Sequence, residues 1–219
     1  MFLANTIEGG SRLKPGPTPV VFIVDDDLSV RESLQSLVRS AGWQAETFAS
    51  AKDFLARPRV VTPSCLVLDV QLPDLSGLAL QQRVVDRIDM PIIFITGYTD
   101  VPVTVQAMKA GAIEFLTKPY QSDVVLDAIQ NAFERSRAAL GQQAKMMSIR
   151  DHYASLSRRE REVMALVVSG LLNKQVGGEL GISEITVKAH RGNVMRKMRA
   201  ESVPDLVRMA ASLEIASAL

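Results

Sequence analysis

Four short apolar runs constrain the fold of this chain most, because each one ends in a polar or charged residue. The runs and the residues that close them are 20–24 with Asp25 and Asp26, 65–68 with Asp69, 92–95 with Thr96, and 114–117 with Lys118. Short runs of β-branched and aromatic residues are typical of strands that are buried on both faces of a sheet. The carboxyl ends of parallel strands meet at one edge of an open α/β sheet, where such folds bind ligands. The sequence therefore predicts that these polar residues lie together.

Segments with a helical apolar period separate the runs, and a weaker strand is expected at 44–48. This alternation predicts an α/β domain with a five-stranded, doubly wound parallel sheet. Its last helix is expected from Val124 to about Ala139. Beyond residue 152 no strand signal occurs. A capping box at Ser157 and Glu160 opens a helix there, and the helices that follow predict a second, smaller all-α domain of the helix-turn-helix type.

We predict four segments along the 219 residues. They are a flexible, Gly- and Pro-containing N-terminal tail at 1–18, the α/β domain at 19–138, a polar linker at 139–153 and the helix-turn-helix domain at 154–219. The longest nearly apolar stretch, 163–172, is shorter than the roughly 18 residues that a membrane span needs. We therefore expect a cytoplasmic protein with no membrane partner.

The acidic residues at the strand ends suggest a metal site. Asp25, Asp26 and Asp69 would repel one another in one cleft unless a cation compensates their charge, and Mg²⁺ prefers hard oxygen ligands of this kind. Asp69 could then attack phosphorus as a nucleophile, while Lys118 and the Thr96 hydroxyl stabilise the transferring oxygens. Each residue also has an ordinary explanation, as a turn residue, a strand threonine or a surface lysine. Their shared position at strand ends favours phosphoryl transfer.

The charges divide unevenly between the two predicted domains. Residues 1–140 carry 13 Lys and Arg against 16 Asp and Glu, a net charge of −3, and residues 141–219 carry 12 against 8, a net charge of +4. A helix at 184–199 would place Val187, Val194 and Met198 on one side and a basic face opposite them. Charge alone favours a solvated surface helix, but such a face also suits the major groove of DNA.

The motifs at the strand ends resemble those of the receiver domain of two-component response regulators, across about residues 19–138. The matching segments are 24–26, 68–69 with 73–77, 96–97 and 118–119. The resemblance implies that Asp69 is the phosphoacceptor, with Asp26 and Asp69 binding Mg²⁺ directly, Asp25 through water, and Gln71 through its main-chain carbonyl. It also implies a histidine kinase as the phosphoryl donor, a Thr96 that moves toward the phosphoryl group, and Phe115 as a switch aromatic. Simple core packing explains Phe115 equally well. Tyr98 lies where the family varies, and is a candidate for tuning hydrolysis of the acyl phosphate.

Residues 156–197 resemble the LuxR-type helix-turn-helix, which with the receiver gives a NarL/FixJ-type regulator, closest in pattern to the FixJ-like group. The resemblance implies that Lys188, Ala189 and Gly192 lie near base edges and that Thr186, Asn193 and Lys197 lie near the DNA backbone. Arg191, Arg196 and Arg199 complete the predicted DNA-binding set. Gly177-Gly178 departs from the alanine that is usual in the family, and either looser packing or a tight contact would account for it.

These resemblances imply a transcription regulator that phosphorylation controls, and not an enzyme. Its expected partners are a histidine kinase, promoter double-stranded DNA and a second copy of the chain, with RNA polymerase as a further candidate. Receiver pairing in FixJ-like proteins uses the region that matches 101–120, and the last helix, with Leu206, Ala210 and Leu213, either pairs subunits or completes a small core. The alternative is a phospho-responsive protein-interaction module, or a phosphate sink, without a DNA target.

Overall fold

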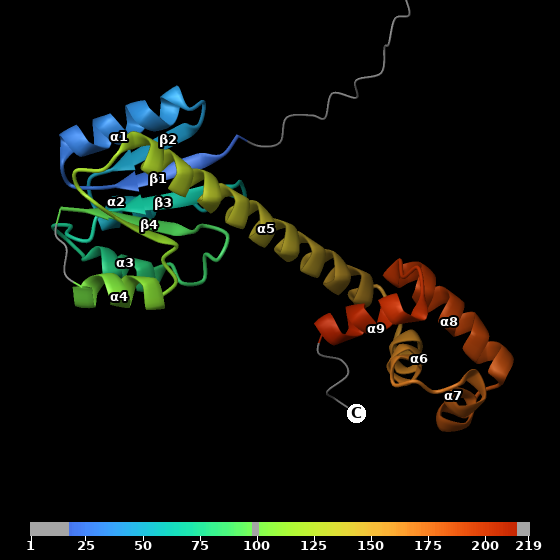
Figure 1. Cartoon of the computed structure of the whole chain (residues 1–219). Coiled ribbons are helices and arrows are strands. Elements are labelled where there is room, and N and C mark those ends of the chain that lie inside the picture. The colour runs from blue at the N-terminus through green and yellow to red at the C-terminus, as the bar shows by residue number, and fades with distance from the viewer. Residues whose placement is uncertain (1–17, 98–100, 214–219) are drawn as a thin grey trace, which may run out of the picture. The chain divides into compact units, whose positions relative to one another are not determined.

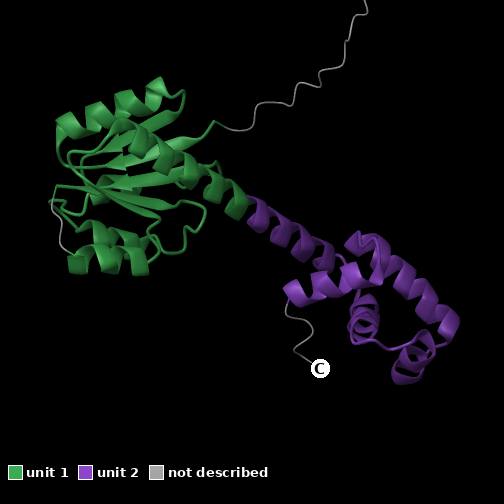
Figure 2. Ribbon diagram, viewed as in Figure 1, with its two compact units in different colours: residues 1–140 green, residues 141–219 purple. Residues whose placement is uncertain are grey.

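The computed structural model describes residues 18–97 and 101–213 (Figure 1). The chain divides into two compact units between Leu140 and Gly141 (Figure 2). The expected flexible tail, apart from Thr18, and Tyr98 lie outside the described residues. Within them, no helix has both the length and the apolar character needed to cross a membrane.

Unit 1 contains the predicted five-stranded parallel sheet, in the order β2-β1-β3-β4-β5. The strands are β1 Val20–Val24, β2 Gln44–Phe48, β3 Ser64–Leu68, β4 Ile92–Thr96 and β5 Glu114–Thr117. The order places β1 beside β3, where the direction of winding reverses, and ligands of open α/β folds bind in the crevice at such a point. The predicted fold class is therefore confirmed.

Alternate residues of the strands face two separate apolar layers. Phe22 and Leu66 belong to a layer that α2 Ala51–Ala56, α3 Gly77–Arg83 and α4 Val101–Lys109 cover (Figure 1). Ile23 and Val67 belong to the opposite layer, which α1 Leu28–Ser40 and the first turns of α5 cover. β1, β3 and β4 are buried along their whole length, which explains why their sequences are continuously apolar.

Helix α5, Ser122–Ala154, is longer than the sequence predicted. The expected end near Ala139 is wrong, and the polar segment that was expected to be a linker is helical throughout. Ile149, near the end of α5, is buried in the apolar core of unit 2 with Leu156 and Val163. The last turns of α5 are therefore part of the packing of unit 2.

Unit 2 is all-helical across its described residues, as predicted. It comprises the end of α5 and α6 Arg158–Val168, α7 Asn173–Leu180, α8 Glu184–Met198 and α9 Val203–Ser212. The capping box predicted at Ser157 and Glu160 is present. Leu206 and Ala210 of α9 are buried in the same core as Val187, Val194 and Met198 of α8, so α9 does complete a small core.

Candidate functional site

The acidic residues predicted from the strand ends lie together at the carboxyl edge of the sheet. Asp25 and Asp26 follow β1, Asp69 follows β3, and carboxylate oxygens of all three lie within 4.8 Å of one another. The ammonium group of Lys118, which follows β5, donates hydrogen bonds to Asp25 Oδ2 at 2.7 Å and to Asp69 Oδ2 at 2.8 Å. Residues from three strands thus form one cluster of charges.

Main-chain groups hold the second oxygen of two of these carboxylates. Asp25 Oδ1 accepts a hydrogen bond from the Asp27 N–H at 2.9 Å, and Asp69 Oδ1 accepts one from the Gln71 N–H at 3.1 Å. Asp25 and Asp69 are buried, whereas Asp26 is exposed at the mouth of the site. The buried pair is therefore fixed in orientation, and Asp26 faces solvent.

Burial raises the pKa of Asp25, and repulsion from Asp69 adds to this effect, while Lys118 and the Asp27 N–H act in the opposite direction. Burial alone would lower the pKa of Lys118, but its hydrogen bonds to Asp25 and Asp69 outweigh that effect and raise it. Lys118 therefore stays charged at neutral pH. One ammonium cannot balance three carboxylates, so the site has capacity for a further cation.

The donor set fits Mg²⁺, which favours hard oxygen ligands and is commonly held by one or two carboxylates with water and phosphate oxygens. Asp25, Asp26 and Asp69 supply such oxygens within one cluster. The main-chain carbonyl expected from Gln71 belongs to the residue whose N–H already bonds Asp69. The residues present are thus compatible with the metal that the sequence predicted.

Thr96 and Phe115 occupy neighbouring strands beside this cluster. Thr96 is buried at the end of β4, and its main-chain oxygen accepts a hydrogen bond from the Lys118 N–H at 2.8 Å. The Phe115 ring is half-buried against the core, with its centroid 6.0 Å from that of Phe94. This packing accounts for Phe115 as a core residue and leaves its switch role a prediction.

The loop after Asp69 is anchored in two ways that the sequence did not reveal. The Asp74 carboxylate accepts hydrogen bonds from the Ala51 N–H at 3.2 Å and the Lys52 N–H at 2.8 Å, at the start of α2. These bonds lower the pKa of Asp74, the Lys52 N–H having the larger effect. A Cβ atom on Gly77 would lie 2.2 Å from the main-chain oxygen of Asp69. Only glycine therefore allows α3 to begin this close to Asp69.

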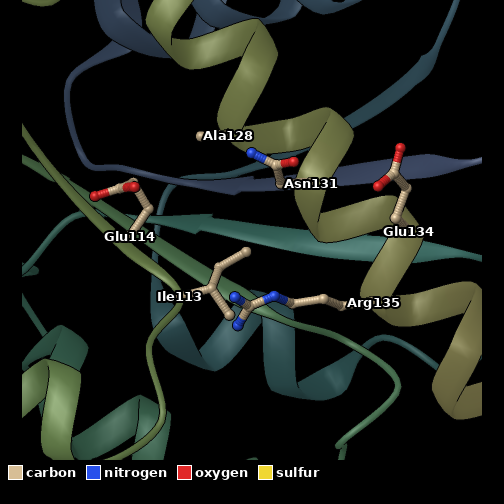
Figure 3. Close-up of a pocket in the computed structure, with 6 residues that line it drawn as sticks. All are labelled: Ile113, Glu114, Ala128, Asn131, Glu134 and Arg135. Carbon is tan, nitrogen blue, oxygen red and sulfur yellow. The ribbon is translucent and has the colours of Figure 1, made fainter.

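A separate pocket of about 310 Å³ lies between β5 and α5 (Figure 3). Its lining residues are Ile113, Glu114, Ala128, Asn131, Glu134 and Arg135. None of them belongs to the acidic cluster, and the carboxylates of Glu114 and Glu134 are drawn on opposite sides of the opening (Figure 3). We therefore assign the chemistry to the carboxyl edge of the sheet and not to this pocket.

In unit 2 the predicted DNA-binding residues lie on α8 or at its end. Lys188, Ala189, Gly192, Arg196 and Arg199 are exposed, while Val187, Val194 and Met198 are buried, as the helical spacing predicted. Lys188 pairs with Glu184 at 3.2 Å, and Arg196 donates a hydrogen bond to Asn193 at 3.0 Å. Arg199 ends the helix in the left-handed conformation, with φ of 54°.

The remaining members of the set make contacts inside unit 2. The Thr186 hydroxyl lies 2.8 Å from that of Ser183, and Arg191 donates a hydrogen bond to Asn173 of α7 at 2.9 Å. Lys197, which was expected near the DNA backbone, pairs with the buried carboxylate of Glu160 at 2.6 Å. Its ammonium group ties α8 to the capping box of α6.

Comparisons with known proteins agree with both halves of this description. The family model of the response regulator receiver domain matches residues 21–130, and the model described as bacterial regulatory proteins of the luxR family matches residues 154–210. The chain belongs to the two-component response regulators. Its two matched domains are a receiver and a LuxR-type DNA-binding domain.

Curated relatives match this regulator over nearly its whole length. Nodulation protein W of Bradyrhizobium diazoefficiens is 47% identical, over 95% of this chain and 92% of that protein. Transcriptional regulatory protein FixJ of Rhizobium meliloti is 44% identical, over 87% of this chain and 94% of that protein. The solved structure of response regulator StyR is 44% identical, with a TM-score of 0.79 over 89% of this chain and 99% of that one. The predicted class of transcription regulator is therefore confirmed.

Proposed function

We propose that this regulator accepts a phosphoryl group on Asp69 and that the modification controls its binding to promoter DNA. The observation that carries the proposal is the bridge from Lys118 to Asp25 and Asp69, with the Asp26 carboxylate in the same cluster. It assembles a nucleophile, a fixed cation and two further carboxylates at one edge of the sheet. These are the groups that phosphoryl transfer to a carboxylate needs.

The transfer is a substitution at phosphorus. An oxygen of Asp69 forms the new bond to phosphorus, the bond to the imidazole nitrogen of a phosphohistidine breaks, and that nitrogen takes the bonding electrons. Lys118 lies 2.8 Å from Asp69 Oδ2 and is placed to neutralise charge on the transferring oxygens. The Thr96 hydroxyl is proposed to hydrogen-bond the phosphoryl group once it is attached, and Phe115 to respond to that movement.

We propose that Asp25, Asp26, Asp69 and the main-chain carbonyl of Gln71 hold Mg²⁺. When bound, the ion supplies positive charge that offsets the carboxylates and the phosphoryl oxygens. The chain itself orients Asp69 through the Gln71 N–H and Asp25 through the Asp27 N–H.

The proposed output is DNA binding by a dimer. We propose the receiver at 19–138 and the DNA-binding domain at 154–219, with the exposed residues of α8 facing the duplex. Thr186, Arg191 and Asn193 border this face, and we propose Lys197 as a positioning residue instead of a DNA contact. A shift from 1:99 to 99:1 between two forms requires about 5.5 kcal/mol of differential interaction from the phosphoryl group. The proposed phosphoryl donor is a histidine kinase, and the proposed partner at the promoter is RNA polymerase. We propose that this activity takes place in the cytoplasm.

The experiment treats the protein with acetyl phosphate and Mg²⁺ and measures intact mass, oligomeric state and selection of genomic DNA. We expect a gain of about 80 Da, a dimer and enrichment of one sequence motif, and none of these for Asp69→Ala. A gain in mass without any selected DNA would instead favour a phosphate sink or a protein-interaction module. Absence of the mass gain would refute phosphorylation at Asp69.

A further inference from the structure

Ile185, in the first turn of α8, is the most exposed large apolar residue of this helix. Its side chain is 80% exposed, whereas Val187 and Met198 of the same helix are fully buried. A single exposed apolar residue is ordinary on a protein surface. Val61 of unit 1 is 83% exposed and belongs to neither of the two sites described above. Exposure alone therefore does not indicate that Ile185 contacts a ligand, whereas its position on α8 does.

Ile185 lies on the exposed side of α8, which is the side proposed to face DNA. Lys188 and Ala189 follow Ile185 by three and four residues, and Gly192 follows by seven, which places all four on one face of the helix. Ala189 and Gly192 are exposed and small, and a Cβ atom added to Gly192 would have no neighbour within 4 Å. Ile185 therefore projects beside small residues, where the backbone of another molecule can approach α8 closely.

The first turn of a recognition helix is the part that contacts base edges in the helix-turn-helix. In the major groove only thymine presents a methyl group, at C5, and cytosine carries a hydrogen atom at the same position. Isoleucine has no donor or acceptor in its side chain, and so the base contact that it favours most is the one with that methyl group. Lys188 beside it supplies the positive charge that draws the helix to DNA.

We infer that Ile185 packs against a thymine methyl group in each half-site and makes this regulator select thymine there. The inference rests on the DNA-binding function of the family and on the proposed orientation of α8. It adds a specificity-determining residue outside the set predicted from the sequence, which began at Thr186.

The test is a methyl-deletion scan of the selected duplex. Each thymine is replaced singly by deoxyuridine, which removes only the C5 methyl, and affinity is measured by fluorescence anisotropy with the phosphorylated full-length protein. We expect one thymine per half-site at which the replacement weakens wild-type binding about fourfold, the value of one buried methyl group of about 0.8 kcal/mol. Ile185→Ala should bind both duplexes equally.

Two variants control for general damage. Leu172→Ala removes another apolar side chain that is 70% exposed, at the start of α7, and should retain the fourfold ratio. Ile185→Val keeps a branched side chain and should give an intermediate ratio even if Ile185→Ala binds too weakly to measure. An unchanged thymine-to-uracil ratio in Ile185→Ala and Ile185→Val, or no sensitive thymine in the wild type, would overturn the inference. A wild-type protein that selects no duplex would overturn the DNA-binding proposal itself, and the inference with it.

Discussion

Replacing Lys197 by methionine should destabilise unit 2 without removing a DNA contact. Lys197 pairs with Glu160 at 2.6 Å, and the side chains are 32% and 6% exposed, respectively. Methionine keeps most of the aliphatic stem and removes the charge. The Glu160 carboxylate would then remain buried with its hydrogen bonds to Ser157 alone to offset the loss, among them the one from the Ser157 N–H at 2.8 Å.

The magnitude follows from the burial of the two partners. Breaking a fully buried ion pair costs about 3–5 kcal/mol, and an exposed pair contributes about 0–1 kcal/mol. Because Glu160 is buried and Lys197 is one-third exposed, we expect a loss of about 2 kcal/mol, or roughly a thirtyfold rise in the opening of α6 and α8.

The loss should depend on pH with a defined sign. Hydrogen bonds from Lys197 and from the Ser157 N–H lower the pKa of Glu160. A carboxylate with a lowered pKa stabilises the folded state above its ordinary value of about 4.3, and this contribution disappears as the pH falls through the folded pKa. The difference in unfolding free energy between wild type and Lys197→Met should therefore shrink in acid.

Hydrogen exchange followed by mass spectrometry measures the opening of α6 and α8 in the intact protein. Arg196→Met is the matched control, because Arg196 neighbours Lys197 but is exposed, and within the part of the chain that the structure describes its side chain bonds only Asn193. Arg196→Met should leave hydrogen exchange unchanged. It should make the slope of log K for DNA against log salt concentration shallower by about 0.9 per protomer. Unchanged exchange in Lys197→Met, together with a reduced salt slope, would show that Lys197 is a phosphate contact and refute the reasoning.

Three further outcomes are expected. Because burial raises the pKa of Asp25, the folded receiver holds the Asp25 proton to higher pH than the unfolded chain, so the contribution of Asp25 to the metal-free unfolding free energy should fall as pH rises above about 3.9. Urea titrations followed by tryptophan fluorescence measure this contribution as the difference between wild type and Asp25→Asn at each pH, since the other titrating groups, such as Asp74, are common to both proteins. Gly178→Ala should stabilise unit 2 by up to about 1 kcal/mol, whereas Gly177→Ala should destabilise it in thermal unfolding, because a Cβ there lies 2.8 Å from a main-chain oxygen and at Gly178 it meets nothing within 4 Å. Asp74→Ala should weaken Mg²⁺ binding about tenfold in calorimetry, because Asp74 ties the loop that carries Asp69 and Gln71 to the start of α2. Ser50→Ala removes the other cap of α2 and should leave Mg²⁺ binding unchanged. If both variants weaken it equally, Asp74 acts only as a helix cap.

The sequence predicted the carboxyl edge of the sheet because its signals are local. Each strand is a continuous apolar run, and parallel strands necessarily bring the residues that follow them to one edge. Helix starts were equally legible, since Asp27, Ser157 and Ser183 each cap the helix that follows with their own side chain. Strands and helix caps that depend on neighbouring residues can therefore be predicted without knowing the tertiary contacts of the chain.

Apolar periodicity alone does not predict the full extent of α5. Residues 139–148 lack that period, and Gly141 suggested an interruption. However, the segment is rich in Ala, Gln, Lys and Met, which are strong helix formers, and one glycine costs only about 1 kcal/mol in a helix. The burial of Ile149 in the core of unit 2 then holds the final turns. Intrinsic helix propensity therefore predicts this part of α5 better than apolar periodicity does.

We propose that Lys197 matches the family motif in position but acts within unit 2 instead of contacting DNA. The resemblance grouped it with the DNA-facing residues, yet it follows the buried Val194 by three positions and so lies on the flank of the apolar stripe. That spacing was visible in the sequence, but its partner was not, because Glu160 is 37 residues away and becomes a neighbour only when α6 packs against α8. On this proposal the basic residues of α8 have two functions: Lys188 and Arg196, which are exposed, face the duplex, and Lys197 holds α8 against α6. A count of positive charges would overestimate the phosphate contacts of this helix, and the salt slope of each single variant separates the two groups.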